Sequence, residues 1–571
     1  MPRDQKGEIR RGQLITTYGV GSIVAFDDES FMVAGADEWG TTGMEIHEPR
    51  LERRLGVSGF RLPPASEDGE DIPVVRFPEW GHCPTCKTLD RLKRLAGGSR
   101  RNTCTTCADV LVPSRFVICC EAGHIDDFPW FGWVHAGSPP AGNQHDMTLE
   151  SGGLTASLGD IRVICTCGKQ ATMENVFQRE ALKRVSSCNG RRPWLTVDET
   201  ECQQLPRVLQ RGASNVWFSI THSALSIPPW SQGAFKVLNA RWDVIRYITD
   251  EATLRGMITG MRIAEGTPYS VDDLVRVVRE RQDGEALDSD ATSHDLKLDE
   301  HRALIANTPE RERGQDFVCV PGDLPDDLRS WFSSVMLATR LREVRALQGF
   351  TRINPPSSDS AAQTQPIFES HLDWLPAIEV HGEGIFLELD EGALERWEQL
   401  EAVRKRAEVV NRRFHESSGL RSTSVTISPR LMLVHTFAHA LINQWSLSAG
   451  YPAASLRERI YVDGGIAGLL IYTGTSDSAG SLGGVVASAA PQVLLSNVRE
   501  AVRRSSWCSG DPLCVESEAS GTDGLNLAAC HACALLPEVS CEEMNRFLDR
   551  ALLIGTPENQ AIGFFSALME P

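Results

Sequence analysis

The chain has 571 residues, a formal net charge of −19 and 16 cysteines. Its length exceeds what one hydrophobic core can organise, so we expect several domains, and its composition is typical of soluble globular proteins. The strong negative charge argues against a protein that coats nucleic acid with its whole surface. Any DNA contact therefore requires a local basic patch or a partner.

No charge-free apolar run approaches the roughly 20 residues that a membrane-spanning helix needs. The first residues, MPRDQKGEIRRG, lack the apolar core of a secretory signal. We therefore expect a cytoplasmic protein. In that compartment cysteines stay reduced, so metal ligands are expected rather than disulfides.

In chain order, the sequence predicts an α+β multidomain protein with four regions. Residues 1–80 form a β-rich segment, in which residues 10–35 are typical of strands around a tight turn. Residues 81–235 form a cysteine-rich zinc-binding region. Residues 236–365 are mainly helical, and residues 366–571 form a C-terminal α+β zinc-binding domain.

The strongest motif is a pair of Cys-x-x-Cys turns separated by seventeen residues: Cys83, Cys86, Cys104 and Cys107. Each turn places two thiolates on one side of a metal, and two turns complete a tetrahedral zinc. The spacing predicts a zinc ribbon. Such a closed site is structural rather than catalytic.

The loop between the two turns carries a cluster of cations: Arg91, Lys93, Arg94, Arg100 and Arg101. One interpretation is a solvated connector. The other is a nucleic-acid-binding loop whose cations contact phosphate. The sequence leaves both open.

A second ligand set is predicted from Cys165 and Cys167, with Cys188 and Cys202 as partners. Between the ribbon and this set lies ICCEAGHIDDFPW, which contains Cys119, Cys120 and His124. A Cys/His nucleophile needs an orienting group and an oxyanion site, and neither is visible. A packed turn is the favoured interpretation.

The middle region contains a capping signal, Ser270 with Asp273, before an apolar helical series. The acidic stretch 283–300 is predicted to be solvated or mobile. A helix is expected from about Asp326 to Leu347, and a domain boundary at NPPSSDSAAQTQP.

The C-terminal region opens with two predicted strands between Trp374 and Asp390, followed by a charged helix. Ser428 and Pro429 suit the N-cap and first turn of a buried helix. On that helix, HTFAH places His435 and His439 one turn apart. A zinc peptidase needs Glu beside the first histidine, and this chain has Thr436 there. Core or interface histidines are therefore favoured.

The last cysteines predict another zinc site, from Cys508, Cys514, Cys530 and Cys533. Ser540 and Glu543 form a capping box before an apolar series, which predicts a helix with Cys541 in its first turn. Cys541 there has a stabilised thiolate and could replace one of the four ligands. The sequence contains no GxxxxGK[ST] phosphate loop and no GxSxG elbow.

Several stretches in order along the chain resemble one family: RRGQLITTYGVGSIV, CCEAGHIDDFPW, CTCGK with NGRRPWL, RLREVRALQGFTRI, WLPAIEVHGEGIFLELD, HTFAHALI, DSAGSLGG and ACHAC…CEEMNRFLDR. They resemble the DrmB family, a component of the bacterial DISARM anti-phage defence system. The last stretch is similar to a zinc-binding domain that follows the motor in certain DNA helicases. The resemblance implies a DrmA-like helicase/ATPase as partner and binding of invading DNA.

From the residues and the resemblance together, we expect a non-catalytic subunit with two or three Zn²⁺ ions per chain. It would partner the helicase, assist it in engaging foreign DNA and have no contact with membranes. The alternative is a zinc-dependent hydrolase that uses His435, His439 and a distant carboxylate.

Overall fold

The computed structural model describes most of the chain, in the ranges 6–40, 43–65, 71–98, 102–137, 145–152, 157–197, 201–228, 237–238, 241–267, 269–287, 293–309, 315–356, 363–370, 372–417, 426–463, 465–474, 484–521 and 524–569. Among these residues, none of the helices combines the length and apolarity required to cross a bilayer. The chain divides into two compact units. The first comprises residues 1–47, 55–222 and 345–378, and the second comprises residues 48–54, 223–344 and 379–571.

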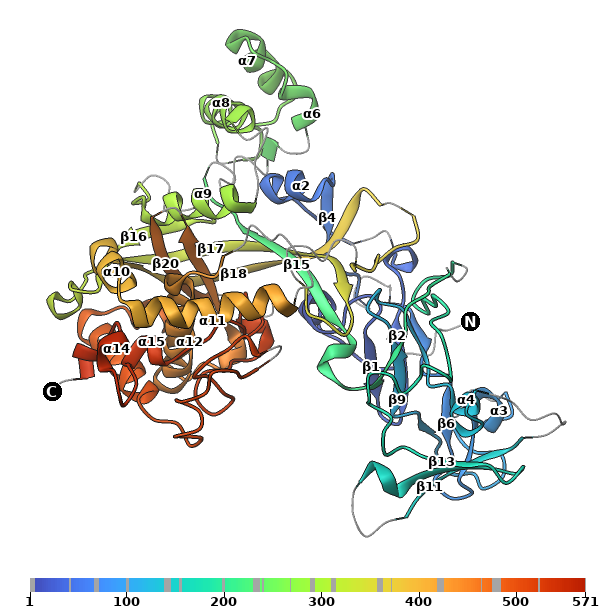
Figure 1. Cartoon of the computed structure of the whole chain (residues 1–571). Helices are drawn as coiled ribbons and strands as arrows, with labels where there is room; N and C mark the ends of the chain where they lie inside the picture. Colours follow the sequence, from blue (N-terminus) through green and yellow to red (C-terminus); the bar gives the residue numbers. More distant parts are fainter. Residues whose placement is uncertain are drawn as a thin grey trace. The chain divides into compact units, whose positions relative to one another are not determined.

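The first unit is built mainly from short strands in small sheets (Figure 1). One sheet has the order β1-β2-β5, a second β10-β9-β14, and a third β13-β12-β11-β7-β6-β8. Their bounds are β1 Ile23–Phe26, β2 Glu29–Val33, β5 Val74–Arg76, β6 Trp80–His82, β7 Thr88–Arg91, β8 Val112–Pro113, β9 Phe116–Cys119, β10 Ile125–Asp127, β11 Met147–Ser151, β12 Ile161–Cys165, β13 Gln170–Thr172 and β14 Arg207–Gln210. The remaining elements are α1 Arg11–Thr16, β3 Glu45–Ile46, β4 Gly59–Arg61, α3 Leu92–Leu95 and α4 Trp130–Val134.

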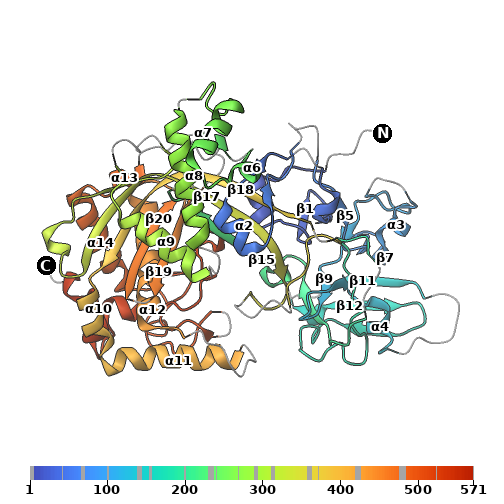
Figure 2. The same ribbon diagram turned by 90° about the horizontal axis from the view of Figure 1, so that it is seen from above.

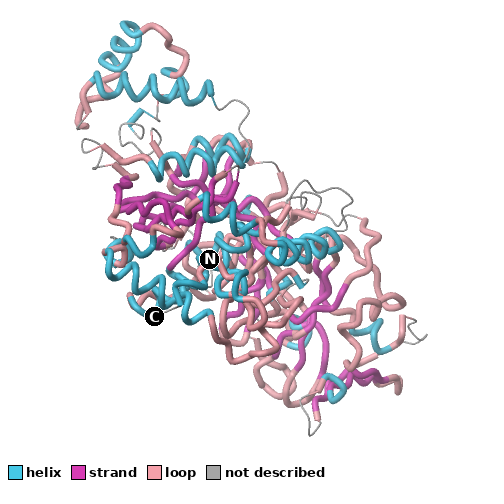
Figure 3. The backbone as a smooth tube through the Cα atoms, turned by 60° about the vertical axis from the view of Figure 1, so that its left-hand side comes forward, coloured by secondary structure: helices cyan, strands magenta, loops and turns pink. Residues whose placement is uncertain are grey.

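The second unit contains a long-stranded sheet in which β17, β18, β20 and β19 are neighbours in that order. The strands are β15 Phe218–Leu225, β16 Val318–Pro321, β17 Phe332–Thr351, β18 Trp374–Leu389, β19 Leu456–Asp463 and β20 Ile466–Thr473; the residues of β15, β17 and β18 are shared between the two units. The helices are α2 Pro49–Leu55, α6 Trp242–Ile245, α7 Glu251–Gly260, α8 Val271–Leu287, α9 Ser293–Ile305, α10 Glu391–Glu398, α11 Glu401–Ser417, α12 Pro429–Ser448, α13 Gly484–Ala487, α14 Pro491–Ser505 and α15 Ala551–Ile554. In Figure 3 helices flank these strands.

The sheet of the second unit is buried on both faces. Successive side chains of a strand point to opposite faces, so neighbouring residues of β18 join different cores. Leu387 and Leu389 join the core around α12, whereas Phe386 joins the core that includes residues of α8 and α9. Helix α12 packs on β19 and β20 and against α14 and α15 (Figure 1). Helix α9 contacts β16 and β19 (Figure 2).

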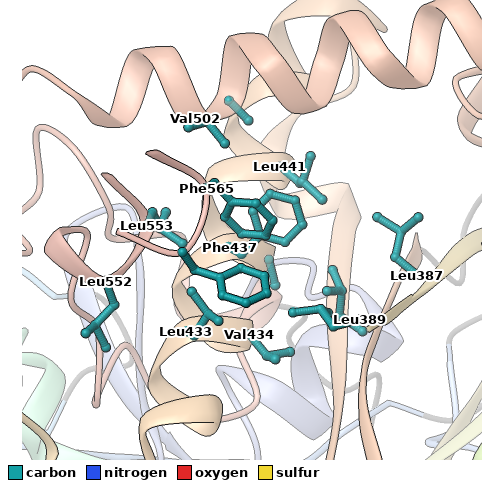
Figure 4. Close-up of a cluster of buried hydrophobic side chains, with 14 of the residues drawn as sticks. Leu387, Leu389, Leu433, Val434, Phe437, Leu441, Val502, Leu552, Leu553 and Phe565 are labelled. Carbon is teal, nitrogen blue, oxygen red and sulfur yellow. The ribbon is translucent and has the colours of Figure 1, made fainter. Parts of the chain in front are cut away.

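The core around α12 is dominated by aromatic and aliphatic side chains (Figure 4). The rings of Phe437 and Phe565 have centroids 4.6 Å apart, and Leu433, Leu441 and Leu553 are buried beside them. This burial explains why α12 is apolar nearly all round. Its predicted N-cap is confirmed, since Ser428 Oγ accepts a hydrogen bond from the backbone N–H of Leu431 (3.2 Å).

The predicted helix from Asp326 to Leu347 is wrong, because the chain forms strand β17 there. A strand buried on both faces loses its apolar/polar alternation, so its period no longer separates it from a buried helix. Charged side chains within the segment make it still harder to distinguish a strand from a helix in the sequence. Arg342 is buried in the strand, where its guanidinium donates to Glu379 Oε1 (2.9 Å from Nε) and to Ser226.

The predicted helix after Ser540 is also wrong. Met544, Asn545 and Phe547 have φ values of 52°, 56° and 65°, which a right-handed helix does not allow. Ser540 Oγ donates instead to the carbonyl oxygen of Ala453 (2.9 Å). Cys541 therefore does not lie in the first turn of a helix.

Two further expectations differ from the structure. Residues 10–35 begin with α1, and only β1 and β2 are strands. The acidic stretch 283–300 is helical at both ends, and Glu300 is buried, where it accepts two hydrogen bonds from Arg459 (2.6 and 2.8 Å).

The capping interaction of Ser270 with Asp273 is confirmed at α8. The DSAGSLGG motif, apart from its last residue Gly484, and the centre of NPPSSDSAAQTQP lie outside the described residues.

Candidate metal centres

Within the described part of the chain, five groups of side chains bring four ligand atoms within 4.8 Å of one another. Four of them contain two or more cysteines. We call these the ribbon group (Cys83, Cys86, Cys104, Cys107), the Cys120 group (Cys120, His124, Cys188, Cys202), the His135 group (His135, His145, Cys165, Cys167) and the Cys508 group (Cys508, Cys514, Cys530, Cys533). The zinc bond lengths of about 2.0–2.3 Å place tetrahedral ligand atoms roughly 3.3–3.8 Å apart.

The ribbon group is held by two equivalent turns. The carbonyl of Cys83 accepts from the N–H of Lys87 (2.9 Å), and the carbonyl of Cys104 accepts from the N–H of Ala108 (2.8 Å). Lys87 and Ala108 both have positive φ, which reverses the chain after each pair. The sulfurs of Cys83 and Cys107 are 3.3 Å apart, far beyond a disulfide bond but within the range for two ligands of one zinc.

The His135 group corrects the predicted second site. Strand β11 pairs with β12 so that Met147 faces Cys165, and this register brings His145 Nδ1 to 3.3 Å from Cys165 Sγ. His135 follows α4, and its Nε2 lies 3.3 Å from Cys167 Sγ. Its Nδ1 donates to the carbonyl of Phe131 (2.7 Å), which leaves the Nε2 lone pair facing the sulfurs.

Cys188 and Cys202, expected beside Cys165 and Cys167, belong instead to the Cys120 group. Strands β9 and β10 form a hairpin with Cys120 and His124 at its turn, where the N–H of Cys120 donates to the carbonyl of His124 (3.1 Å). His124 Nδ1 lies 3.4 Å from Cys120 Sγ and 3.6 Å from Cys188 Sγ. The favoured interpretation of this stretch as a simple packed turn overlooked these ligand positions. Cys119 stands outside all five groups.

A buried arginine supports the hairpin turn of the Cys120 group. Arg352 donates to the carbonyls of Gly123 (3.0 Å), Val216 (2.6 Å) and Gly21 (2.8 Å). Burial lowers the pKa of this guanidinium to about 10. Because Gly123 lies directly before His124, Arg352 fixes the backbone that presents this ligand.

The Cys508 group brings together the four cysteines predicted for the last site. The sulfurs of Cys508 and Cys530 are 3.4 Å apart, and those of Cys514 and Cys533 are 3.7 Å apart. The N–H of Gly510 donates to Cys508 Sγ (3.3 Å), a contact that stabilises a thiolate. Cys541 does not join this group. It lies with His435, His439 and Glu458 in the fifth group.

Hydrogen bonds favour the thiolate, the form of cysteine that binds metals, at one sulfur of three groups, whereas they raise the pKa of partner thiols such as Cys107 and Cys188. The Thr88 hydroxyl lowers the pKa of Cys86 to about 6. The thiol of Cys188 lowers the pKa of Cys120 to about 4, and the backbone N–H of Lys169 lowers the pKa of Cys167 to about 6. Thiol and imidazole donors at these separations fit Zn²⁺.

The described cations of the ribbon loop are exposed, whereas the leucines between them are buried. Leu92 and Leu95 of α3 are buried against the cysteines of the ribbon group. The side chains of Arg91 and Arg94 are 65% and 72% exposed, and Lys93 between them is also exposed. Arg94 pairs with Asp90 (3.2 Å) and Arg91 with Glu79 (3.8 Å). Arg100 and Arg101 lie outside the described residues.

Three histidines of the cysteine-rich groups were not predicted as ligands from the sequence: His124, His135 and His145. The spacing Cys120-x3-His124 is itself ligand-like, so this pair was within reach of sequence reasoning. His135 and His145 had no such signal. Only the pairing of β11 with β12 and the end of α4 place them at Cys165 and Cys167.

Two family models match parts of this chain. Residues 10–218 match a family model described as a domain of unknown function (DUF8724), and residues 437–534 match the MrfA Zn-binding domain. The chain is 31% identical over 565 residues to the DISARM protein DrmB of Bacillus paralicheniformis, covering 95% of this chain and 99% of the relative. The chain belongs to the DrmB family.

The MrfA Zn-binding domain match contains all four ligands of the Cys508 group. The helices and strands of the structure confirm the α+β fold that the sequence predicts. The domain match confirms the predicted C-terminal zinc-binding domain. The match to the domain of unknown function covers every member of the ribbon, Cys120 and His135 groups. Three of the five groups thus lie in the DUF8724 region.

Proposed function

We propose that this DrmB-family chain is a non-catalytic zinc protein of bacterial anti-phage defence. It binds a DrmA-like helicase/ATPase and helps that partner to engage foreign DNA. The family membership and the resemblance of the C-terminal region to helicase-associated zinc domains support the partner.

The observation that carries the DNA role is the construction of the ribbon. Leu92 and Leu95 pack against its cysteines, whereas the cations Arg91, Lys93 and Arg94 are exposed. In a chain with a net charge of −19, such a local group of cations is where phosphate can bind. Arg100 and Arg101 follow in the same stretch of sequence and lie outside the described residues.

We propose four zinc ions for the four cysteine-rich groups, more than the two or three expected from spacing. The donor atoms support this count, because each group offers four thiol or imidazole ligands and no shared member. Four protein ligands complete a tetrahedral zinc and leave no position for substrate. The zinc ions therefore stabilise the fold rather than carry out chemistry.

The alternative, a hydrolase at His435 and His439, has a carboxylate nearby in Glu458. However, the side chains of these three residues are 0% exposed. A hydrolytic zinc needs an open position for water and substrate. Complete burial disfavours this reading.

The test is a pull-down of the tagged chain with the neighbouring helicase gene product, with and without DNA, followed by ATPase measurements. We expect a stable complex whose ATP hydrolysis depends on DNA. We expect no hydrolysis by the chain alone, because its sequence lacks a phosphate-binding loop. Robust ATP turnover by the isolated chain after rigorous purification, or failure to bind the helicase, would contradict the proposal.

A further inference from the structure

The fifth group of potential ligands is assembled from three segments of the second unit. His435 and His439 lie one turn apart on α12, and Glu458 lies on β19. Cys541 directly follows the short 3-10 turn Glu538–Ser540. His435 Nε2 is 3.1 Å from both Cys541 Sγ and Glu458 Oε1. His439 Nε2 is 3.5 Å from the same carboxylate oxygen. These separations are those of ligand atoms around one small cation.

A hydrogen bond from outside the group orients the lone pair of one of its histidines, His439. A carbonyl oxygen can only accept, so His439 Nδ1, which lies 2.8 Å from the carbonyl of Ala534, carries a proton. In the neutral imidazole, Nε2 of His439 then presents a lone pair. This arrangement, with the second ring nitrogen donating to a backbone carbonyl, is typical of metal-binding histidines.

The two acidic members receive backbone hydrogen bonds from outside the group. The N–H of Glu542 donates to Glu458 Oε1 (3.1 Å), and the N–H of Asn545 donates to Cys541 Sγ (3.2 Å). Within the described part of the chain, His439 Nε2 and Glu458 Oε2 have no hydrogen-bond partner. Buried polar atoms without partners are costly, and a missing ion is one explanation for them.

A hydrogen-bonded ion pair without metal is the competing explanation. A protonated His435 would form an ion pair with Glu458 Oε1. The lone pair of His439 Nε2 and the Oε2 atom of Glu458 would still have no hydrogen-bond partner. A divalent cation uses these lone pairs together. One carboxylate and one thiolate also balance its charge, so the complete site is neutral in an interior where a net charge is costly.

We propose that His435, His439, Glu458 and Cys541 bind a fifth metal ion, a buried structural Zn²⁺ with two nitrogen, one oxygen and one sulfur ligand. This donor set suits Zn²⁺. The site is distinct from the four zinc ions assigned above. The MrfA Zn-binding domain match ends at residue 534 and begins at residue 437, so it includes neither Cys541 nor His435. The metal joins α12, β19 and the segment that follows the Cys508 group.

The experiment is elemental analysis of the full-length chain, purified without added metal, together with Cys541→Ser and Glu458→Gln variants. Each variant should hold one zinc fewer per chain than the parent. The matched control is Cys319→Ser, which replaces another buried cysteine of the second unit that belongs to none of the five groups. It should keep the parental zinc content. The comparison uses differences, so it holds whether the other groups bind four ions or fewer.

Reconstitution with Co²⁺ gives a second measurement. When the absorption spectrum of the Cys541→Ser variant is subtracted from that of the parent, the difference should be that of one tetrahedral Co²⁺ ion with a single thiolate ligand. If the variants do not fold, anomalous diffraction at the zinc edge from parental crystals decides the question. A peak among the four side chains is expected. Equal zinc content in parent and variants, or no anomalous peak at the group, would overturn this inference without affecting the proposed role in DNA engagement. If the parent chain holds the fifth ion but its complex with the helicase shows no DNA-stimulated ATP hydrolysis, only the proposed function is contradicted.

Discussion

The imidazole of His439 donates a hydrogen bond from Nδ1 to the carbonyl oxygen of Ala534 (2.8 Å). Ala534 directly follows Cys533, a ligand of the Cys508 group, and its N–H donates to the carbonyl of Cys530 (3.0 Å). The bond therefore connects the buried helix α12 to the cysteine turn. Any change that loosens this turn should reach α12.

The first prediction concerns this connection. Cys530→Ser should remove one zinc from the chain and raise hydrogen exchange in the central turns of α12, because the carbonyl of Ala534 is no longer held in place. Hydrogen-exchange mass spectrometry measures this. Cys83→Ser, a ligand change in the first unit, should also cost one zinc but leave the exchange of α12 unchanged. Unaltered protection of α12 in Cys530→Ser would show that the two elements are independent.

The second prediction tests the regrouping of the middle cysteines. The double variant Cys165→Ser/Cys167→Ser changes one group and should lose one zinc, whereas Cys165→Ser/Cys188→Ser changes two groups and should lose two. Elemental analysis of both proteins decides between the groupings. If all four cysteines shared a single ion, as spacing alone suggested, both doubles would lose only one.

The third prediction concerns the basic loop of the ribbon. Changing Arg91 and Lys93 to Glu should weaken DNA binding by the helicase complex and flatten its salt dependence. Each lost phosphate contact reduces the slope of log K against log salt by about one unit. Zinc content and melting temperature should hardly change, since exposed substitutions usually alter stability by less than about 0.5 kcal/mol.

The matched control for the loop is Arg329→Glu/Arg499→Glu, which makes the same change of charge at two exposed arginines of the second unit. Binding titrations over a range of salt concentrations compare the three proteins. Equal affinity and slope for the loop variant and the parent would identify the loop as a solvated connector. Equal weakening by both double variants would indicate a general charge effect.

The fourth prediction concerns Arg352. Arg352→Lys should reduce the free energy of unfolding by about 1.5–3 kcal/mol for each charged hydrogen bond that the shorter, unforked ammonium fails to make. It should also speed zinc loss to a chelator, because Gly123 and His124 lose their support. The control Arg179→Lys changes an arginine that is 78% exposed and should alter neither property. Denaturant titration and chelation kinetics measure the two effects. Parental chelation kinetics in Arg352→Lys would confine its role to stability.

The sequence determined the features that depend on short spacing along the chain. Two Cys-x-x-Cys turns must each place their thiolates together, so the ribbon group was predictable, and the Cys508 group followed from similar spacing. The N-cap at Ser428 and the apolar composition of α12 were also local, and both predictions hold. The order of family-like stretches identified the DrmB family for the same reason, because it requires only the linear sequence.

The tertiary structure decided which distant residues share a site. The pairing of β11 with β12 places Cys165 beside His145. The β9–β10 hairpin presents Cys120 and His124 to Cys188, so Cys165 and Cys188 belong to different groups. Strand β17 is a strand because it pairs with β15, β16 and β18 in the sheet, and the cores on both of its faces remove the apolar/polar period from its sequence. Likewise, Glu458 and Cys541 meet His435 only through the packing of α12 on β19. Long-range contacts of this kind depend on the whole fold, and no local pattern encodes them.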